Sequence, residues 1–568
     1  MGGFVGLTIA KKALIANQVA METIGHNIAN ANTPGYSRQR VELKESLPDS
    51  TPWGAKGTGV DVDDIIRIRD SYLDVQLRNE TNELGMWDEK EKFLARVELY
   101  FNEPSDTGLA NTMERFWNAW QEVAYMPEEQ TSRNSLYQDA VSLVTGITDL
   151  YNNLESLRTD ADTALKAQIK KINSLADSIA SLNSQIRYYE VGDATANDLR
   201  DQRDQKLAEL ADLIDYEVSE QPDGTVIVSV GGVNLVDKLD TEDMGYRYNS
   251  DGHLDPYWTY NNGSVSVSSG RLYGITNTRD SLIPQYKEII DDIAEKIISE
   301  VNKLHTSGYG LSAFTSLTSQ YDISDSTAVL ASSSSGLDFY DEIQDGSFTM
   351  TVVDSSGNET ENTISISASA TSGTTLNSLI STIGSSFSTG IAHVRASVSS
   401  EGYLTIESDT GYSFYVNNDT SNALMALGLN VFFKGSGADD MDIADPIDNN
   451  VNNIAASSSG EVGDGIVALN ISALKDSKLM DSNSATITDY YGSSLGVLGV
   501  AKKEATDMKN SQEILVTHIK NSIEEISGVS IDEEAMDLIK YQHAYAAAAQ
   551  FLKTIDQMLD ELINGIRR

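Results

Sequence analysis

Two long heptad patterns stand at opposite ends of this chain. Near the start, apolar side chains recur every seven residues at Leu7, Leu14, Met21 and Ile28, with Ala10, Ile24 and Ala31 as companions and Asn17 as a polar exception. Near the end, the same spacing holds for Ile531, Leu538, Tyr545, Leu552, Leu559 and Ile566, with Tyr541, Ala548, Ile555 and Leu562 three residues behind the middle four. Heptads of this length predict coiled-coil helices. Because each apolar seam needs a partner, we expect the two ends to pair, with the rest of the chain looped out between them.

The first pattern predicts a helix over residues 4–32, and the residues after it predict a sharp stop. Thr33 is followed by Pro34 and Gly35, a pair that suits the centre of a type II turn. Asn27, Asn30 and Asn32 occupy the last helical turns, where asparagine commonly caps free backbone groups. Tyr36, just past the turn, is predicted to anchor it by packing. At the other end, Ser530 and Glu533 have the spacing of a capping box that opens the last helix.

Composition narrows the class of protein. With 568 residues, several domains are expected. Asp and Glu outnumber Lys and Arg by 85 to 41, for a formal charge of −44, which argues against nucleic-acid binding. The chain has no cysteine, so disulfides, thiolate metal sites and a cysteine nucleophile are excluded. Neither a secretory leader nor an apolar run of roughly 18 residues is visible, so the sequence chemistry alone predicts a cytosolic protein without membrane insertion.

The interior predicts a nested α+β architecture of several domains. Paired terminal helices enclose a long helical shaft, which in turn encloses β-rich outer insertions. Phe101, Phe116, Trp117 and Trp120 are predicted to form the shaft core. The expected domains are 1–40 with 530–568 (terminal coiled coil), 41–214 with 281–324 and 476–529 (mainly helical shaft), 215–280 (a small β-rich segment), and 325–475 (an outer domain rich in Ser, Thr and Gly, with short strands and about two helices).

Signals for chemistry are weak throughout the chain. The histidines have no zinc-helix spacing, and neither a nucleophile elbow nor a phosphate-binding loop is present. Residues 439–445 carry several aspartates but lack the glycine and glutamate of a calcium loop. We therefore predict no catalytic residue, no metal site and no cofactor.

Several stretches resemble one bacterial family. Residues 26–36, HNIANANTPGY, resemble the N-terminal signature of flagellar axial proteins: rod, hook and hook-associated proteins. The next three residues, together with 101–109 (FNEPSDTGL), 116–124 (FWNAWQEVA) and 198–204 (DLRDQRD), are similar to the first hook-associated proteins within that family. The resemblance covers about residues 1–310 and 485–568, and it is weakest in the outer domain.

The resemblance implies a structural, self-assembling subunit at the junction between flagellar hook and filament. It implies homo-oligomerisation into a tube or ring, in which Asn27, Asn30 and Asn32 make polar contacts with neighbouring subunits in addition to capping. It also implies contact with the hook protein and with a hook-associated protein on the filament side, and an export chaperone on the C-terminal helices. It also implies an extracellular location, reached through the flagellar type III apparatus without a cleaved leader. Terminal helices without stable packing are marginal in water, so residues 1–40 and 530–568 are predicted to be largely disordered before assembly.

Two alternatives stay open at this point. The chain could be another axial protein, such as a third hook-associated protein or a hook protein. It could also be an exported protein whose outer domain, residues 325–475, carries an enzymatic activity.

Overall fold

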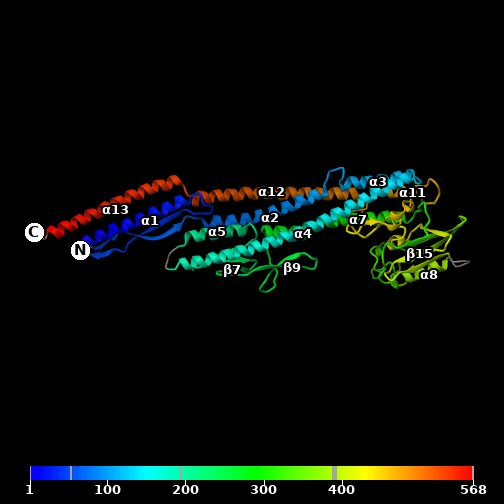
Figure 1. Cartoon of the computed structure of the whole chain (residues 1–568), viewed down its shortest axis with the longest axis horizontal. Coiled ribbons are helices and arrows are strands. Elements are labelled where there is room, and N and C mark those ends of the chain that lie inside the picture. Colours follow the sequence, from blue (N-terminus) through cyan, green and yellow to red (C-terminus); the bar gives the residue numbers. More distant parts are fainter. Residues whose placement is uncertain (1, 52–53, 192–194, 387–392, 566–568) are drawn as a thin grey trace. The chain divides into compact units, whose positions relative to one another are not determined.

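In the computed structural model of the chain, residues 2–51, 54–191, 195–386 and 393–565 are described, with residues 2–4, 562, 564 and 565 as backbone only. The helices are α1 (Gly2–Asn30), α2 (Ser71–Phe101), α3 (Leu109–Tyr125), α4 (Gln130–Tyr189), α5 (Asn197–Ala211), α6 (Gly270–Asn277), α7 (Ile283–His305), α8 (Leu376–Ser386), α9 (Ala423–Leu427), α10 (Asp445–Asn449), α11 (Ile466–Ser472), α12 (Ile487–Ser527) and α13 (Ile531–Gly565) (Figure 1). The mixture of helix and strand expected from the sequence is confirmed.

The strands form small antiparallel sheets. They are β1 (Gln39–Glu45), β2 (Asp49–Thr51), β3 (Gly54–Lys56), β4 (Val60–Arg67), β5 (Glu217–Glu220), β6 (Val226–Val230), β7 (Val233–Asp237), β8 (Asp240–Thr241), β9 (Met244–Tyr248), β10 (Leu254–Trp258), β11 (Ser316–Thr318), β12 (Gly346–Asp354), β13 (Glu359–Ile366), β14 (Val394–Val398), β15 (Leu404–Ser408), β16 (Tyr412–Asn417), β17 (Phe433–Lys434) and β18 (Asp442–Ile443). The sheet orders are β1-β4, β2-β3, β5-β6-β7-β8, β10-β9, β11-β15-β14, β13-β12-β16 and β17-β18.

The chain divides into two compact units. Unit 1 comprises Met1–Lys92, Thr159–Thr278 and Lys503–Arg568, and unit 2 comprises Phe93–Arg158 and Arg279–Lys502. The boundary crosses α2, α4 and α12, so each of these long helices contributes to both units. The finer division into four domains that the sequence suggested stays a prediction.

In unit 1, α1 packs along α13, so the two ends of the chain are partners (Figure 1). The approach is close: a Cβ added to Gly6 would meet the Cδ1 atom of Ile555 at 3.0 Å. A hairpin of β1 and β4 also packs on α1, and a Cβ on Gly59 would lie 3.3 Å from the Cα atom of Ile9. Because α1 has two neighbours rather than one, its buried face differs from a simple coiled-coil seam.

The buried face of α1 is rotated away from the predicted heptad. Its buried residues are Ala10, Ala16, Ala20, Thr23, Ile24 and Asn27. Leu7, by contrast, is 37% exposed, and Leu14, Met21 and Ile28 are half-buried. Of the predicted seam, Ile24 and the companion Ala10 are thus buried within one chain. Small side chains face the hairpin and α13 because both approach the helix closely.

The heptad of α13 behaves similarly. Ile555 is buried, Leu538, Tyr541, Leu552 and Leu559 are half-buried, Tyr545 is 37% exposed and Ile531 is 54% exposed. Ile566 and the side chain of Leu562 lie outside the described residues. The helix itself runs as expected from just after Ser530, and its coiled-coil geometry remains a prediction.

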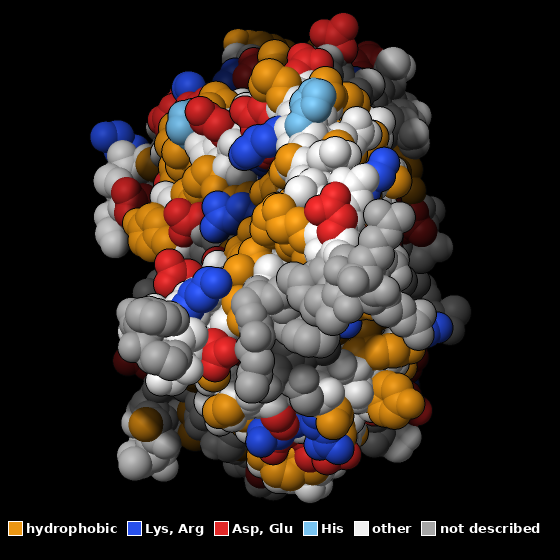
Figure 2. Space-filling view, turned by 90° about the vertical axis from the view of Figure 1, so that its left-hand side faces the viewer, with side chains coloured by type: hydrophobic (Ala, Val, Ile, Leu, Met, Phe, Trp, Pro, Cys, Tyr) orange, Lys and Arg blue, Asp and Glu red, His pale blue; other side chains and the backbone are white. Residues whose placement is uncertain are grey.

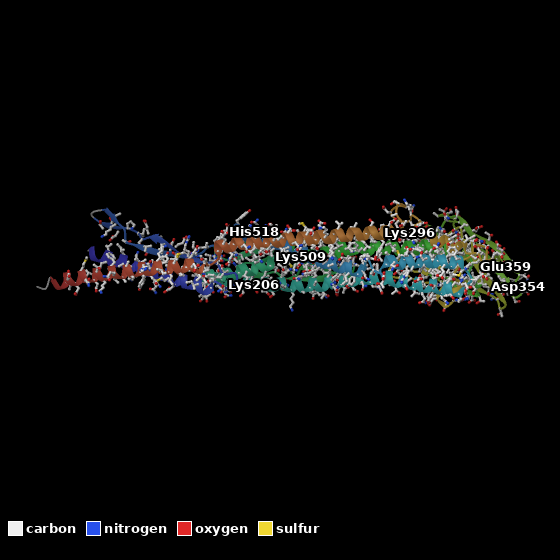
Figure 3. All side chains as sticks on the ribbon, turned by 90° about the horizontal axis from the view of Figure 1, so that it is seen from above. Lys206, Lys296, Asp354, Glu359, Lys509 and His518 are labelled. Atoms are coloured by element: carbon white, nitrogen blue, oxygen red, sulfur yellow. The ribbon has the colours of Figure 1, made fainter. Side chains whose placement is uncertain are left out.

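The rest of unit 1 is a helical layer that carries small sheets. Within the segment expected to be β-rich, residues 215–280, β5 and β6 form a hairpin in which Val218 pairs with Val228. It docks on α4 through Asn183, whose side-chain amide donates to the carbonyl oxygen of Val226 at 2.9 Å. Asp88 of α2 accepts hydrogen bonds from Arg271 at 2.6 Å and from Lys509 of α12 (labelled in Figure 3) at 2.7 Å. These ion pairs tie α2 to α6 and α12 within the unit.

Unit 2 has an aromatic core. Phe101, Phe116, Trp117 and Trp120 are all buried. The ring of Trp120 lies 5.0 Å from that of Phe432, and Phe116 lies 4.9 Å from Trp117, measured between centroids. Residues 325–475 contain short strands and helices, as expected. In β12, Phe348, Met350 and Val352 are buried together with the threonines between them, and in β15 Leu404 and Ile406 are buried. Helix α8 lies between β13 and β14.

Candidate assembly site at the N-terminal turn

The turn after α1 has the predicted type II geometry. The backbone N–H of Tyr36 donates to the carbonyl oxygen of Thr33 at 3.2 Å, which places Pro34 and Gly35 at the centre. Gly35 has a φ of 77°, the left-handed value that this position requires. Asn32, Thr33, Pro34 and Gly35 are exposed. The turn itself is therefore exposed, while the segments before and after it contact other parts of unit 1.

Asn27 joins three segments of the chain. It is 1% exposed, and its side-chain amide nitrogen donates to the carbonyl oxygen of Gln39 at 2.9 Å and to the carboxylate of Glu534 at 3.0 Å. Its amide oxygen accepts from the backbone N–H of Gln39 at 3.0 Å and from the hydroxyl of Tyr36 at 2.8 Å. All four hydrogen-bonding positions of the amide are used, so Asn27 is a buried connector and does not cap α1.

Tyr36 anchors the turn through its hydroxyl as well as its ring. Because its single proton goes to Asn27, the Nδ1 atom of His26, 3.0 Å away, is the donor to the phenol oxygen. The rings of His26 and Tyr36 meet edge to face with centroids 5.6 Å apart. Burial, together with the nearby carboxylates of Asp198, Asp201 and Glu534, raises the pKa of Tyr36 well above its ordinary value. The phenol therefore stays protonated, as its donation to Asn27 requires.

Glu534 fixes the start of α13 to the segment after the turn. Its carboxylate is 2% exposed and accepts from the Nε atom of Arg38 at 2.6 Å. The neighbouring Glu533 accepts from the same guanidinium at 3.0 Å but is 59% exposed. The expected capping box is thus incomplete: the backbone N–H of Glu533 reaches the Ser530 hydroxyl at 3.5 Å, while the Glu533 side chain turns to Arg38.

Helix α5 holds the other flank. Asp201 is 5% exposed and accepts from the backbone N–H of Ser37 at 2.9 Å and from its hydroxyl at 2.8 Å. Arg67 of β4 bridges Asp201 and Asp204, at 2.8 Å to each. Asp198, three residues earlier, accepts from the side-chain amide of Gln39 at 2.8 Å. Aspartates at a spacing of three lie on one face of a helix, and here that face meets the turn.

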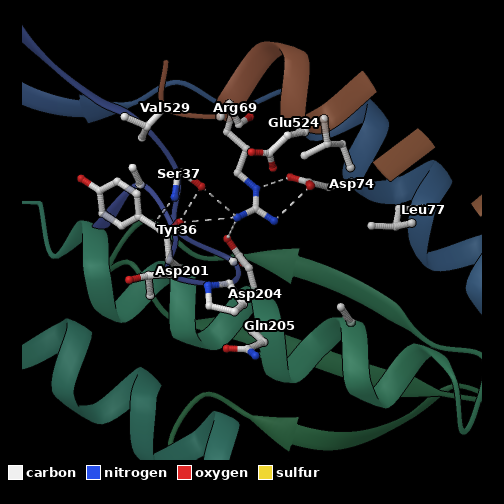
Figure 4. A pocket seen from close by; sticks show the side chains of 18 of the residues that line it. Tyr36, Ser37, Arg69, Asp74, Leu77, Asp201, Asp204, Gln205, Glu524 and Val529 are labelled. Atoms are coloured by element: carbon white, nitrogen blue, oxygen red, sulfur yellow. Dashed lines mark hydrogen bonds and ion pairs between the residues drawn. The ribbon is translucent and has the colours of Figure 1, made fainter. Parts of the chain in front are cut away.

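A pocket opens beside this flank (Figure 4). It is lined by the turn and by parts of α2, α5 and α12, and Arg69 crosses it. The Arg69 guanidinium donates to Asp74 at 2.5 and 3.0 Å and lies 3.0 Å from Asp204. Burial opposes this charge, but Asp74, Asp204 and Asp201 raise the pKa of Arg69. The charge of Arg69 in this pocket is therefore neutralised by the aspartates around it.

The remaining residues singled out from the sequence fall into two places. Asn30 does cap the end of α1, since its amide donates to the carbonyl oxygen of His26 at 3.1 Å and its amide oxygen accepts from Thr33. The aromatic residues predicted for the shaft core lie in unit 2, whereas this site lies in unit 1. In the described part of the chain, no group of three or more His, Cys, Asp or Glu could hold a metal ion. Nor is any helix in that part long and apolar enough to cross a membrane.

Sequence reasoning missed the charged half of the site. Arg38, Arg67, Asp201 and Glu534 carry most of its hydrogen bonds, yet they were not singled out as site residues. The signal was present in the DLRDQRD stretch, where aspartates repeat every three residues. The arginines of that stretch face elsewhere. Arg203 is 2% exposed and donates to the carbonyl oxygen of Gly224 at 2.6 Å, which ties α5 to the β5–β6 hairpin.

Three family models match the chain in segments. The flagellar hook-associated protein FlgK helical domain matches residues 94–316, the flagella basal body rod protein model matches residues 7–36, and the flagellar basal body rod FlgEFG protein C-terminal model matches residues 521–565. The last two matches contain α1 with its turn and most of α13, the elements that form the site described above.

Curated relatives match over almost the whole length. Flagellar hook-associated protein 1 of Bacillus subtilis is 27% identical over 602 aligned positions, covering 99% of this chain and 98% of the relative. The proteins of the same name from Escherichia coli and Salmonella typhimurium are 26% and 24% identical, each with 98% of both chains covered.

A solved structure shares the fold. It is described as the structure of the flagellar hook junction protein FlgK from Burkholderia pseudomallei, with a TM-score of 0.53, 15% identity, and coverage of 80% of this chain and 100% of that one. The matches that cover almost the whole chain are all to one kind of flagellar axial protein, which has a structural role in motility. Over nearly its whole length the chain is similar to proteins named flagellar hook-associated protein 1, and its residues 94–316 match the helical domain of that family.

Proposed function

We propose that this chain is the subunit that joins the flagellar hook to the filament, and that it assembles through α1 and α13. The observation that carries the proposal is the apolar surface that these helices keep after pairing with each other. Large hydrophobic side chains stay exposed on both, among them Leu7 (37%), Ile15 (47%), Met536 (65%), Ile539 (55%), Phe551 (48%), Met558 (61%) and Ile563 (65%). Figure 2 views the side on which these helices are drawn in Figure 1 and shows hydrophobic side chains between charged ones.

Single exposed hydrophobic residues are normal on protein surfaces, but a series along one helix pair marks a contact surface. Burying a Met, Ile or Phe side chain contributes roughly 1.5–3 kcal/mol, so a ring of copies that covers these residues gains substantial free energy. The chain's charge of −44 opposes self-association, so apolar contacts are needed to hold copies together. The α1 and α13 helices of neighbouring copies are therefore the surfaces that would cover these exposed residues.

The proposal has further parts that rest on kinship with the hook-associated relatives. The chain is exported through the flagellar type III apparatus without a cleaved leader, and a chaperone holds its C-terminal helices beforehand. Once outside, it contacts the hook protein on one side and another hook-associated protein on the filament side. Its role is structural, without catalysis, and the terminal segments 1–40 and 530–568 order fully when copies assemble.

Deletion of each terminal segment tests this proposal. Cells that carry a chain lacking residues 2–40, or one lacking residues 531–568, are expected to build hooks but no filaments, and to shed flagellin into the medium. The matched control is Glu359→Ala, at the exposed hairpin labelled in Figure 3, which should leave filaments normal. Immunoblots of the medium report whether each chain leaves the cell. Normal filaments on either deletion would contradict assembly through the terminal helices.

A further inference from the structure

A second exposed apolar surface lies in unit 2, where α11 packs on α3. We call it the α3–α11 patch, and it consists of Tyr125 (73% exposed), Met126 (44%), Val462 (86%), Ile466 (54%) and Leu469 (47%). The proposed assembly through α1 and α13 does not use these residues. A patch of several large apolar side chains is uncommon on a monomer and marks a site of protein contact.

The five residues come from the C-terminal end of α3, from α11, which packs on α3, and from the loop before α11. Lys475, just after α11, donates to Glu114 of α3, and a Cβ on Gly465 would meet the backbone of Ala124, so the two helices run antiparallel. Tyr125 is eleven residues after Glu114, which at 100° per residue places both on nearly the same face of α3. That face borders α11. Ile466 and Leu469, three residues apart, share the exposed face of α11.

The loop that presents Val462 is held firmly. The carboxylate of Asp464 accepts from the backbone N–H groups of Ser458 and Ser459 at 2.8 Å and from the hydroxyls of Ser457, Ser458 and Ser459 at 2.8–2.9 Å. The backbone N–H of Gly463 donates to Glu128 at 2.5 Å, which ties the loop to the end of α3. These bonds lower the pKa of Asp464, so the carboxylate keeps them at neutral pH. A preorganised loop loses little conformational entropy when a partner covers it.

The border of the patch is acidic. Residues 120–130 contribute Glu122, Glu128 and Glu129, residues 457–472 contribute Glu461 and Asp464, and neither segment contains Lys or Arg. Lys475 beyond the helix is already paired with Glu114. Patch-to-patch pairing of two copies would bring the same acidic border against itself, and like charges set against each other weaken an interface.

From the apolar centre and its acidic border we propose that the α3–α11 patch binds a different protein, through a face that has an apolar centre bordered by Lys and Arg. The partner is therefore not a second copy of this chain bound through the same patch. Attraction between the two borders would orient the partner, and burial of Val462, Ile466 and Tyr125 would hold it.

Photocrosslinking tests the inference in intact cells. The full chain is expressed in its bacterium with p-benzoylphenylalanine in place of Val462, the cells are irradiated, and adducts are identified by mass spectrometry. We expect an adduct with a different protein, joined at a peptide that contains apolar residues next to Lys or Arg. Glu122→Lys combined with Glu461→Lys should reduce its yield about tenfold, whereas Asp354→Lys with Glu359→Lys, on a remote hairpin, should not.

Three results would overturn the inference: no adduct at position 462, an adduct that joins two copies of this chain, or an adduct whose yield does not respond to reversal of the border charges. Circular dichroism of the purified variants checks that they fold. The same crosslinker in place of Met558 probes the terminal helices separately. Failure of the assembly proposal would show at position 558, whereas failure of this inference would show at position 462.

Discussion

The side-chain amide of Asn27 donates to the carboxylate of Glu534 at 3.0 Å, although the two residues are 507 positions apart in the chain. Asn27 lies near the end of α1 and Glu534 in the first turn of α13. Their contact is buried and continues through Tyr36, Gln39 and Arg38. A buried polar contact therefore fixes the start of α13 to the end of α1, next to the turn that carries the family signature.

Removal of the Glu534 carboxylate should loosen α13. In Glu534→Ala, the guanidinium of Arg38 and the amide of Asn27 lose a buried acceptor, which costs about 1–3 kcal/mol. Hydrogen exchange over residues 531–560 should accelerate accordingly, while exchange in unit 2 stays the same.

Glu533→Ala is the matched control for this prediction. Its carboxylate contacts the same arginine but is 59% exposed, and exposed ion pairs contribute about 0–1 kcal/mol. Equal acceleration of exchange in the two variants would show that Glu534 has no special role in holding α13.

Asp201 should matter more than its neighbour Asp198. Asp201→Ala leaves the backbone N–H and hydroxyl of Ser37 without their buried acceptor, and it removes one of the two carboxylates that the Arg67 guanidinium bridges. We expect unit 1 to lose about 2–4 kcal/mol of unfolding free energy, measured by urea denaturation. Asp198 has a side chain that is 55% exposed, so Asp198→Ala should cost about 1 kcal/mol or less. A reversed order would contradict the arrangement of hydrogen bonds around the turn.

His305 should make unit 2 less stable in mild acid. Burial lowers its pKa from 6.5 to about 4, and in the neutral form its Nδ1–H donates to the carbonyl oxygen of Asn430 while Nε2 accepts from the backbone N–H of Ala455. Between these pH values the unfolded chain binds more protons than the folded one. Stability from this group is therefore complete above about pH 6.5 and is lost as the pH falls towards 4, by roughly 3 kcal/mol.

The measurement is the difference in unfolding free energy between pH 7 and pH 4, compared between the natural chain and His305→Gln. The variant should have the smaller pH dependence. His518→Gln, at an exposed position of α12 labelled in Figure 3, should match the natural chain. An unchanged pH dependence in His305→Gln would mean that the imidazole is not held neutral.

The terminal helices show what periodicity could and could not predict. The heptads correctly placed α1 and α13 and made them partners, because a seven-residue repeat reports where one helix has apolar side chains. They did not locate the buried face of α1, since the β1–β4 hairpin occupies a second side of that helix. Ala16 and Ala20 belong to the buried face of α1, and small residues give little signal in a pattern of large apolar ones.

The charged contacts of the site were harder to predict for a different reason. Asn27 was expected to cap a helix, and locally that is the commonest role of asparagine in such a position. Its actual partners come from β1 and α13, and hydrogen bonds between distant segments leave no periodic trace in one sequence. The turn itself could be predicted in detail because Pro34 and Gly35 restrict the backbone without help from distant residues.

The most direct test of assembly through the terminal helices is the double variant Met536→Glu with Ile539→Glu. These side chains are 65% and 55% exposed on α13, so the purified chain should keep its unfolding free energy to within about 0.5 kcal/mol. Tyr248→Glu, at a 70% exposed position of β9, is the control. In cells that export the double variant to the medium, our account predicts intact hooks, no filaments and free flagellin in electron micrographs and immunoblots. Filaments of normal number and length would contradict it.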